Sequence, residues 1–155
     1  MVHSDGRGIC GVEALARWQP SEGTTIGPDI FIPLAERSGL IETLGQQIMT
    51  KAVRAAAQWP GLGLAVNVSP LQLKNPRFVR QVLDILARAS FEPSRLTIEI
   101  TEGVLISNPD QAHRAIKGLK AAGIKIALDD FGCGFASIGT LRAFGFDRMK
   151  VDRLS

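Results

Sequence analysis

The segment Lys125-Ile126-Ala127-Leu128-Asp129-Asp130-Phe131-Gly132-Cys133-Gly134-Phe135 contains an abrupt change from apolar to acidic residues. Its apolar run, Ile124 to Leu128, is typical of a buried strand. Carboxylates at the end of a buried strand cost free energy unless a cation compensates them, and two adjacent carboxylates also repel each other. A divalent metal is therefore the natural partner of Asp129 and Asp130.

Segments typical of strands alternate with segments typical of helices along the chain. Besides Ile124 to Leu128, the strand-like segments are Ile9 to Trp18, Leu62 to Val68, Leu96 to Ile100 and Arg148 to Val151. The helix-like segments are Asp29 to Arg37, Leu40 to Trp59, Asn75 to about Ala89, Asn108 to about Gly123, and Ser137 to Phe144. This alternation predicts a parallel α/β fold.

Apolar spacing also predicts which side chains enter the core. In the segment Leu40 to Trp59, apolar residues recur at three- and four-residue steps and predict one buried face. That predicted face consists of Ile41, Leu44, Ile48, Ala52, Ala55 and Trp59. Trp18 is likewise expected in the core.

The composition fits a single folded domain over residues 1–155, with 45% hydrophobic and 21% charged residues. The net charge is +3 without a dense Lys/Arg cluster, which predicts no long nucleic-acid partner but is compatible with a small phosphorylated ligand. Cys10 and Cys133 lack metal-type spacing and are interpreted as reduced cytosolic thiols. No apolar run approaches the ~18 residues of a membrane span, so a cytoplasmic segment is expected, with any anchor elsewhere in a parent protein.

Polar residues recur where the strands are expected to end: Glu13, Asn67, Glu99, Asp129, Asp130, Lys150 and Asp152. In parallel α/β folds the carboxyl ends of the strands form one rim, where ligands and catalytic groups gather. Carboxylate and amide oxygens suit Mg²⁺ or Mn²⁺, and the absence of His and Cys argues against zinc or copper. Two such metals would polarise a phosphodiester and supply a hydroxide, with Lys150 orienting the water or neutralising the phosphate.

Each of these positions also has a structural explanation when taken alone. A single Asp or Glu at a strand end can start a loop or cap a helix, and Asn67 can belong to a turn. Lys150 with Asp152 can form an exposed ion pair. Glu102 lies three residues beyond Glu99, so in a strand it would point to the opposite face and support a neighbouring loop. The recurrence of polar residues on strand after strand favours a functional site.

Glu13-Ala14-Leu15 followed by Arg17-Trp18 resembles the signature of the EAL domain, a bacterial family that hydrolyses the second messenger cyclic di-GMP to linear pGpG. Further motifs follow in the family's order, nearly from end to end of the chain. They are Phe31 to Ile41, Asn67-Val68-Ser69-Pro70, Glu99-Ile100-Thr101-Glu102, Asp129-Asp130-Phe131-Gly132 and Lys150-Val151-Asp152-Arg153.

The resemblance implies a TIM-like barrel with a two-metal phosphodiesterase site that uses Mg²⁺ or Mn²⁺. It assigns the first metal to Glu13, Asn67, Glu99 and Asp129, and the second to Asp129 and Asp130. Lys150 would contact the attacking water with Asp152 nearby, so Lys150, Glu13 and Asp130 are the expected catalytic residues. The expected substrate contacts are Arg17 with a phosphate, Leu15 with a guanine, and Asp152. Glu102 would brace the loop from Asp130 to Ser137, which in the family couples metal binding to homodimerisation.

The sequence departs from the family in one loop and in length. Cys133, Phe135 and Ala136 replace the usual threonine, tyrosine and serine, and the lost hydroxyls could loosen the loop and slow turnover. A TIM barrel takes about 250 residues and eight strands, whereas five strands are predicted here. The family's Tyr-Gln-Pro strand, a later glutamate that binds the second metal, and a still later glutamine have no counterpart. We therefore expect a partial barrel with an incomplete second metal site, inactive alone but part of an active parent enzyme.

Three functional hypotheses follow. The first is a metal-dependent cyclic di-GMP phosphodiesterase, whose parent protein could also carry a GGDEF cyclase or sensory domain. The second is a catalytically inactive EAL-type receptor for cyclic di-GMP or a protein-interaction module. The third is an assembly formed through the open sheet edges. The retained acidic residues favour the enzyme.

Overall fold

Five parallel strands form one sheet whose spatial order follows the chain, β1-β2-β3-β4-β5. The computed structural model describes residues 11–101, 103, 109–131 and 145–151, with the backbone alone at positions 130, 131 and 148–151. The strands are β1 (Gly11–Ala14), β2 (Gly63–Asn67), β3 (Leu96–Thr101), β4 (Lys125–Phe131) and β5 (Arg148–Val151). Because each strand pairs with the next strand in the chain, the crossovers all step the same way, as in a TIM-like barrel.

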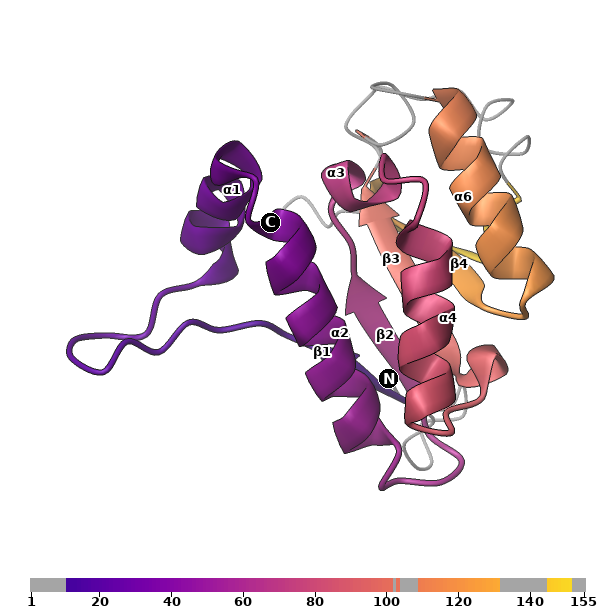
Figure 1. The fold of residues 1–155 in the computed structure, drawn as a ribbon, viewed down its shortest axis with the longest axis horizontal. Helices are drawn as coiled ribbons and strands as arrows, with labels where there is room; N and C mark the ends of the chain where they lie inside the picture. The colour runs from indigo at the N-terminus through magenta and orange to yellow at the C-terminus, as the bar shows by residue number, and fades with distance from the viewer. Residues whose placement is uncertain (1–10, 102, 104–108, 132–144, 152–155) are drawn as a thin grey trace.

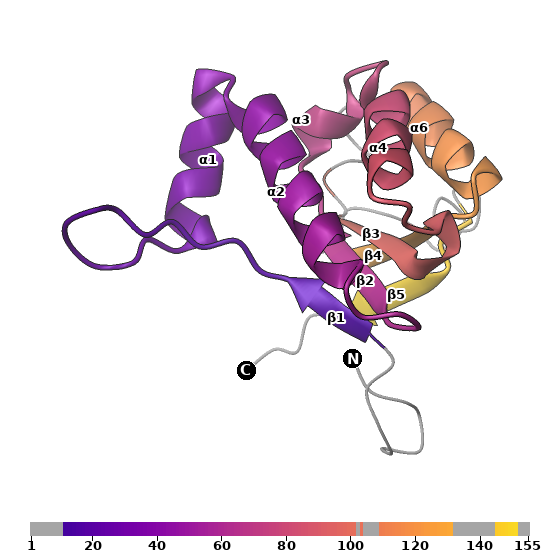
Figure 2. The same ribbon diagram turned by 60° about the horizontal axis from the view of Figure 1, so that its bottom comes forward.

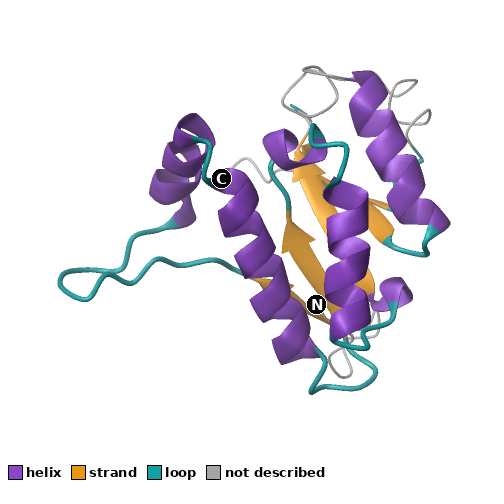
Figure 3. Cartoon of the chain, viewed as in Figure 1, coloured by secondary structure: helices purple, strands orange, loops and turns teal. Residues whose placement is uncertain are grey.

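The helices of the described part cover one face of this sheet. They are α1 (Pro28–Ser38), α2 (Ile41–Ala56), α3 (Pro70–Leu73), α4 (Phe78–Arg88) and α6 (Pro109–Ala121), with a short 3₁₀ turn, η1 (Pro93–Arg95), before β3. Figure 1 shows α2, α4 and α6 across the front of the strands, and Figure 2 shows them on one side of the sheet. Helix α1 stands beyond α2, at the end of the long loop that leaves β1 (Figure 3).

Local sequence signals explain several helix boundaries. Pro28 and Pro109 each occupy the first residue of a helix, where the missing N–H removes no helical hydrogen bond. Gly39, directly after α1, has a φ of 80°, and Gly123, just beyond α6, has a φ of 95°. Glycine reaches this left-handed conformation without steric cost, which ends both helices cleanly.

The two faces of the sheet differ in chemistry. The face toward the helices is apolar and consists of Val12, Ala14, Leu64, Val66, Leu96, Ile98, Ile100, Ile126 and Leu128. These side chains pack against buried helical residues that include Met49, Val53, Phe78, Val82, Leu86, Ile116 and Leu119. A fully buried side chain of this size contributes roughly 1.5–3 kcal/mol, so the packing of the helices against this face of the sheet supplies most of the hydrophobic stabilisation.

The other face is polar or small, and no helix of the described part covers it (Figure 2). Side chains alternate along a strand and registered neighbours share a face. The strand pairing therefore places on this face Glu13, Ala65, Asn67, Thr97, Glu99, Thr101, Lys125, Ala127 and Asp129. In a barrel, this face is the interior.

Arg95 forms a clamp at the amino ends of the strands. Its guanidinium donates hydrogen bonds to the carbonyl oxygens of Leu62 (2.8 Å), Trp59 (2.8 Å) and Ala56 (3.2 Å). The guanidinium carbon also lies 4.3 Å from the centroid of the Phe91 ring. The Arg95 clamp thus ties η1 to the end of α2 and to the connection that enters β2.

The predicted alternation of strands and helices is confirmed, with four local corrections. Residues Ile9 to Trp18 were expected to form one strand, but β1 ends at Ala14, and Trp18 forms an antiparallel bridge with Ile26 through two backbone hydrogen bonds of 3.0 and 2.7 Å. Strand β4 continues to Phe131, so the two aspartates lie within the strand and not after it. The predicted helix from Ser137 to Phe144 lies outside the described residues.

The third correction concerns Asn67 to Pro70, where a turn was one alternative. Pro70 instead begins the four-residue helix α3, for which Ser69 is the N-cap.

The fourth correction concerns the segment expected to start a helix at Asn75. This segment forms a turn, in which Asn75 Oδ1 accepts a 2.9 Å hydrogen bond from the Arg77 N–H, and α4 begins at Phe78.

The predicted core positions on α2 and at the tryptophans are wrong in part. The residues of α2 that become buried are Ile41, Met49, Val53 and Ala56. Leu44 and Ile48 instead line a cavity beside α1, whereas Ala52 borders this cavity and also packs against the core as predicted. Trp18 and Trp59 are each 48% exposed. The helix carries two apolar stripes, and spacing alone does not tell which one meets the sheet.

Candidate active site

The residues predicted at the strand ends form a staggered row on the helix-free face. Glu13 pairs with Ala65, and Asn67 lies two residues further along the same strand and in register with Glu99. Glu99 pairs in turn with Ala127, two residues before Asp129. Each two-residue offset advances roughly 7 Å along a strand, so the four predicted ligands Glu13, Asn67, Glu99 and Asp129 follow a diagonal toward the carboxyl ends.

The first contact in the row joins Asn67 and Glu13. The Asn67 Nδ2 atom donates a 3.2 Å hydrogen bond to Oε1 of Glu13. The amide nitrogen of asparagine can only donate, whereas its oxygen can bind a cation. The nitrogen is directed at Glu13, and the two residues carry their side-chain oxygen atoms on the same face of adjacent strands.

Glu99 is the buried member of the row. It is 2% exposed, and its Oε2 atom is buried. A carboxylate in such a position is costly to keep charged without compensation. A hard cation beside Glu99 would supply compensation, so both the burial and the oxygen chemistry of the row fit Mg²⁺ or Mn²⁺.

Asp129 and its neighbours complete the part of the predicted site that the structure describes. Asp129 is half-buried, in register with Thr101. Asp130 follows it in β4, and Lys150 lies in β5, the strand paired with β4. Only the backbone is described at Asp130 and Lys150. The predicted residues Glu102 and Asp152 lie outside the described residues.

The structure brings some of the predicted ligands together and not others. Glu13 and Asn67 are in contact, and Asn67 and Glu99 are registered neighbours. Among the described residues, however, no three His, Cys, Asp or Glu side chains gather closely enough to form a metal-binding group. An oxygen-rich row is therefore present, without a compact cluster of carboxylates.

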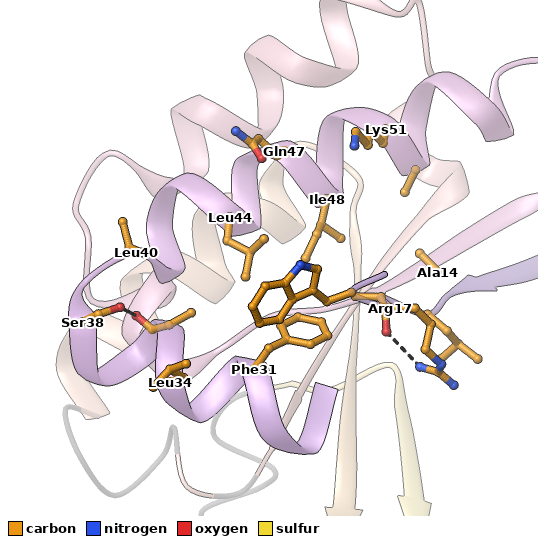
Figure 4. A pocket seen from close by; sticks show the side chains of 15 residues that line it. Ala14, Arg17, Phe31, Leu34, Ser38, Leu40, Leu44, Gln47, Ile48 and Lys51 are labelled. Carbon is orange, nitrogen blue, oxygen red and sulfur yellow. Dashed lines mark hydrogen bonds between the residues drawn. The ribbon is translucent and has the colours of Figure 1, made fainter. Parts of the chain in front are cut away.

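Two of the three predicted substrate contacts, Leu15 and Arg17, line an apolar cavity of about 670 Å³ beside the end of β1. Helices α1 and α2 form its walls. Figure 4 shows Phe31 and Leu34 on one side, Leu44 and Ile48 on another, and Arg17 near Ala14, away from Ser38. The Arg17 guanidinium donates a 2.8 Å hydrogen bond to the Ala16 carbonyl oxygen, and the Leu15 side chain is 63% exposed. Arg17 and Lys51 are the charged residues of the lining, and both are cationic.

Two residues that the sequence analysis did not single out contact Ser69, the N-cap residue of α3. Ser69 Oγ donates a 3.1 Å hydrogen bond to Oε2 of Glu36 on α1. Gln72 completes a capping box, because its Oε1 atom accepts a 3.0 Å hydrogen bond from the Ser69 N–H. The pattern Ser-x-x-Gln at positions 69–72 is a known signature of such a box and could have revealed Gln72. No local pattern indicates the contact of Glu36, which lies 33 residues from Ser69.

Comparison with known proteins gives the family. Residues 1–154 match the family model described as the EAL domain. An uncharacterized signaling protein of Caulobacter vibrioides is 45% identical over 151 residues, which cover 97% of this chain and 18% of the relative. PdeR of Escherichia coli, described as a cyclic di-GMP phosphodiesterase, is 37% identical over 147 residues, which cover 92% of this chain and 22% of PdeR.

A solved structure of the phosphodiesterase MucR in complex with cyclic di-GMP resembles the chain with a TM-score of 0.89 and 36% identity. The match covers 94% of this chain and 61% of the MucR chain. MucR of Pseudomonas aeruginosa is described as a bifunctional diguanylate cyclase and cyclic di-GMP phosphodiesterase, and it is 37% identical over 150 residues, which cover 94% of this chain and 22% of MucR. The chain thus spans about a fifth of the length of the curated relatives it matches.

The fold and the site define an incomplete TIM-like α/β barrel that carries acidic residues on the interior face of its strands. The family match, the identities and the structural likeness agree with this class. The chain belongs to the EAL domain family.

Proposed function

We propose that this chain is the part of a cyclic di-GMP phosphodiesterase that carries most of its first metal site. The observation that supports the proposal is the oxygen row on the interior face, in which Asn67 contacts Glu13 and registers with the buried Glu99. MucR and PdeR, the relatives with this described activity, are each 37% identical to the chain.

The proposed metal ligands are the residues of the row and their neighbour. Glu13, Asn67, Glu99 and Asp129 would hold one divalent cation, and Asp129 with Asp130 would hold a second. When bound, Mg²⁺ or Mn²⁺ polarises the phosphodiester and lowers the pKa of water. Asp129 is the residue shared by the two proposed metals, and it lies on the interior face with Glu13, Asn67 and Glu99.

The reaction converts a cyclic diester into a linear one. A water oxygen forms a bond to phosphorus, the bond from phosphorus to the 3′ oxygen breaks, and that oxygen takes up a proton to give the 5′-phosphorylated dinucleotide pGpG. We propose that Lys150 orients the water, with Asp152 nearby.

Substrate binding is proposed at the cavity beside β1. Its lining is largely apolar, and its charged residues, Arg17 and Lys51, are cationic. A cyclic dinucleotide has flat bases and two negative charges, so it matches such a surface in both respects. Leu15 would contact a guanine and Arg17 a phosphate, with Arg17 exchanging its present bond to the Ala16 carbonyl for the substrate.

The wider assignments are also proposals. We propose a cytoplasmic protein that acts as a homodimer, with Glu102 bracing the loop from Asp130 to Ser137, and with a GGDEF or sensory domain elsewhere in the same protein. The relative MucR is described as bifunctional, with cyclase and phosphodiesterase activities. Across the residues that the structure describes, no helix has the length and apolar character needed to cross a membrane.

The proposal is tested by calorimetric titration of cyclic di-GMP, with Ca²⁺ suppressing turnover, on the 155-residue chain and on a form extended at both ends to a complete barrel. Hydrolysis to pGpG in Mg²⁺ or Mn²⁺ is followed in parallel by chromatography. We expect the extended form to bind and to hydrolyse, its Glu13→Gln variant to lose hydrolysis, and the 155-residue chain to be inactive. Binding without hydrolysis in the extended form would favour a receptor, and the absence of both would point to a protein-interaction role.

A further inference from the structure

A hydrogen-bonded brace connects helix α1 to the segment that carries Asn67, and helix α2 packs against it. Its central residue is Ser69, two positions after Asn67. The Ser69 hydroxyl donates to Glu36 Oε2 (3.1 Å) and accepts from the Leu71 N–H (3.3 Å), while the Ser69 N–H donates to Gln72 Oε1 (3.0 Å). The hydroxyl and the N–H of Ser69 are thus both used, so the conformation of this residue is fixed from two sides.

The backbone between Asn67 and Ser69 is fixed as well. The Val68 N–H donates a 2.9 Å hydrogen bond to the Glu99 carbonyl oxygen. Asn67 is therefore fixed in two ways: it pairs with Glu99 of the neighbouring strand, and it lies two residues before the hydrogen-bonded Ser69. A shift of Ser69 would be transmitted to Asn67 through a single intervening residue.

Gln72 is held in place by helix α2. The residue is 7% exposed, and a Cβ atom added at Gly45 would lie 1.9 Å from Gln72 Nε2. Two atoms cannot approach so closely, so only glycine at position 45 permits α2 and the Gln72 side chain to pack as they do. Gly45 thereby supports the capping box from behind.

These contacts surround one small cavity beside Asn67, the member of the oxygen row that lines it. The cavity has a volume of about 260 Å³, and its lining includes Glu36, Gly45, Asn67, Ser69 and Gln72. The same space is bordered by three helices and by the end of β2. The helices that contact the Asn67 segment therefore meet at this cavity. Leu15 and Arg17, which are predicted substrate contacts, do not line it.

We propose that Glu36 and Gln72 are positioning residues that hold the Asn67 side chain in the geometry needed for the divalent metal, with Gly45 as the packing partner that makes this possible. The inference rests on the proposed function, since it assigns Asn67 to the metal site. Residues that orient a metal ligand without touching the metal affect its affinity by about 10- to 100-fold. Glu36 acts here through its bond to Ser69, and Gln72 through the capping box.

The test measures Mn²⁺ affinity by calorimetry on the complete EAL domain that contains this chain, together with its thermal unfolding. We expect Glu36→Ala to weaken Mn²⁺ binding about 10-fold. Glu36→Gln should lose far less, because the glutamine amide oxygen can still accept the Ser69 hydroxyl bond. Gly45→Ala should resemble Glu36→Ala, since the new methyl group displaces Gln72. Glu92→Gln, which removes an exposed charge at the opposite end of the sheet, serves as the matched control.

A purely structural role predicts a different result. Glu36→Ala and Gly45→Ala would then lower the unfolding temperature but leave the Mn²⁺ affinity of the folded protein equal to that of Glu92→Gln, which would overturn the inference. A second readout is the NMR signal of the Asn67 side-chain amide, which should shift in Glu36→Ala and stay in place in Glu36→Gln. If the unmodified domain binds no Mn²⁺, the proposed metal site fails, and the NMR signal still decides whether the brace positions Asn67.

Discussion

Asn67 and Glu13 lie 54 residues apart in the chain and are joined by a 3.2 Å hydrogen bond from Nδ2 to Oε1. The contact crosses from β2 to β1 on the face of the sheet that no described helix covers. Because the donor is an amide and the acceptor a carboxylate, the pair brings one negative charge and two kinds of oxygen ligand to neighbouring positions on this face. That chemistry makes the pair a sensitive probe of the proposed cation site.

Changing Asn67 to aspartate should destabilise the metal-free protein and increase its stabilisation by metal. The substitution places two carboxylates on adjacent strands, and like charges in such positions cost about 0.5 kcal/mol. A bound divalent cation removes this repulsion. We therefore expect Mn²⁺ to raise the unfolding temperature of Asn67→Asp more than that of the unmodified chain, as measured by calorimetry. Equal shifts in the two proteins would place Asn67 outside the cation site.

Changing Glu99 to glutamine should weaken Mn²⁺ binding at least ~10-fold, because affinity for hard cations depends on the number of charged oxygen ligands. Glutamine keeps the shape of the side chain, so the fold should be preserved. The matched control is Thr97→Val, on the same face of β3 and two residues earlier. Titration with Mn²⁺ should separate the two variants, and similar affinities would exclude Glu99 from the site.

Removing the Arg95 side chain should destabilise the fold without changing the site. Arg95→Ala deletes three hydrogen bonds to backbone carbonyl oxygens, and we expect a loss of roughly 2–3 kcal/mol in the free energy of unfolding. Arg95→Lys should recover only part of it, because an ammonium group cannot reproduce the planar fork of the guanidinium. Urea unfolding measures the loss. The Mn²⁺ affinity of the folded variant should equal that of the unmodified protein.

The two tryptophans should respond differently to substrate. Each is 48% exposed, and Trp18 lines the cavity of Leu15 and Arg17 whereas Trp59 does not. In a Trp59→Phe variant the remaining fluorescence reports on Trp18, and cyclic di-GMP should protect it from quenching by acrylamide. A Trp18→Phe variant is the control and should show no protection. Protection of Trp59 alone would show that cyclic di-GMP does not bind in the cavity beside β1.

The strands and long helices could be predicted from the sequence because their apolar runs, proline starts and glycine ends are local signals. Pro28 begins α1, Gly39 ends it, and Gly123 follows the end of α6 with a left-handed backbone conformation. The shared face of Glu13, Asn67, Glu99 and Asp129 could be predicted for a related reason, since the carboxyl ends of parallel strands lie at the same edge. The strand register determines which of these side chains lie close together. The diagonal from Glu13 to Asp129 depends on the pairing of several strands, which the sequence of one segment does not reveal.

The predictions that were wrong have a common physical cause. The sequence of a segment is compatible with more than one buried face or contact, and packing between distant segments selects one of them. Helix α2 has two apolar stripes, and only its contact with the sheet buries Met49 and Val53 in preference to Leu44 and Ile48. Trp18 was expected in the core, but the chain leaves the sheet after Ala14 and carries it outward. The bond from Ser69 to Glu36 spans 33 residues and has no sequence signature.

The position of the Arg95 clamp has an evolutionary consequence. It fastens the amino ends of the strands, at the opposite edge of the sheet from the row that ends at Asp129. A lineage that exchanged residues in this row, and so gained or lost catalysis, would leave the clamp untouched. Descendants with different activities could therefore inherit one scaffold, and their divergence should be concentrated at the carboxyl ends of the strands.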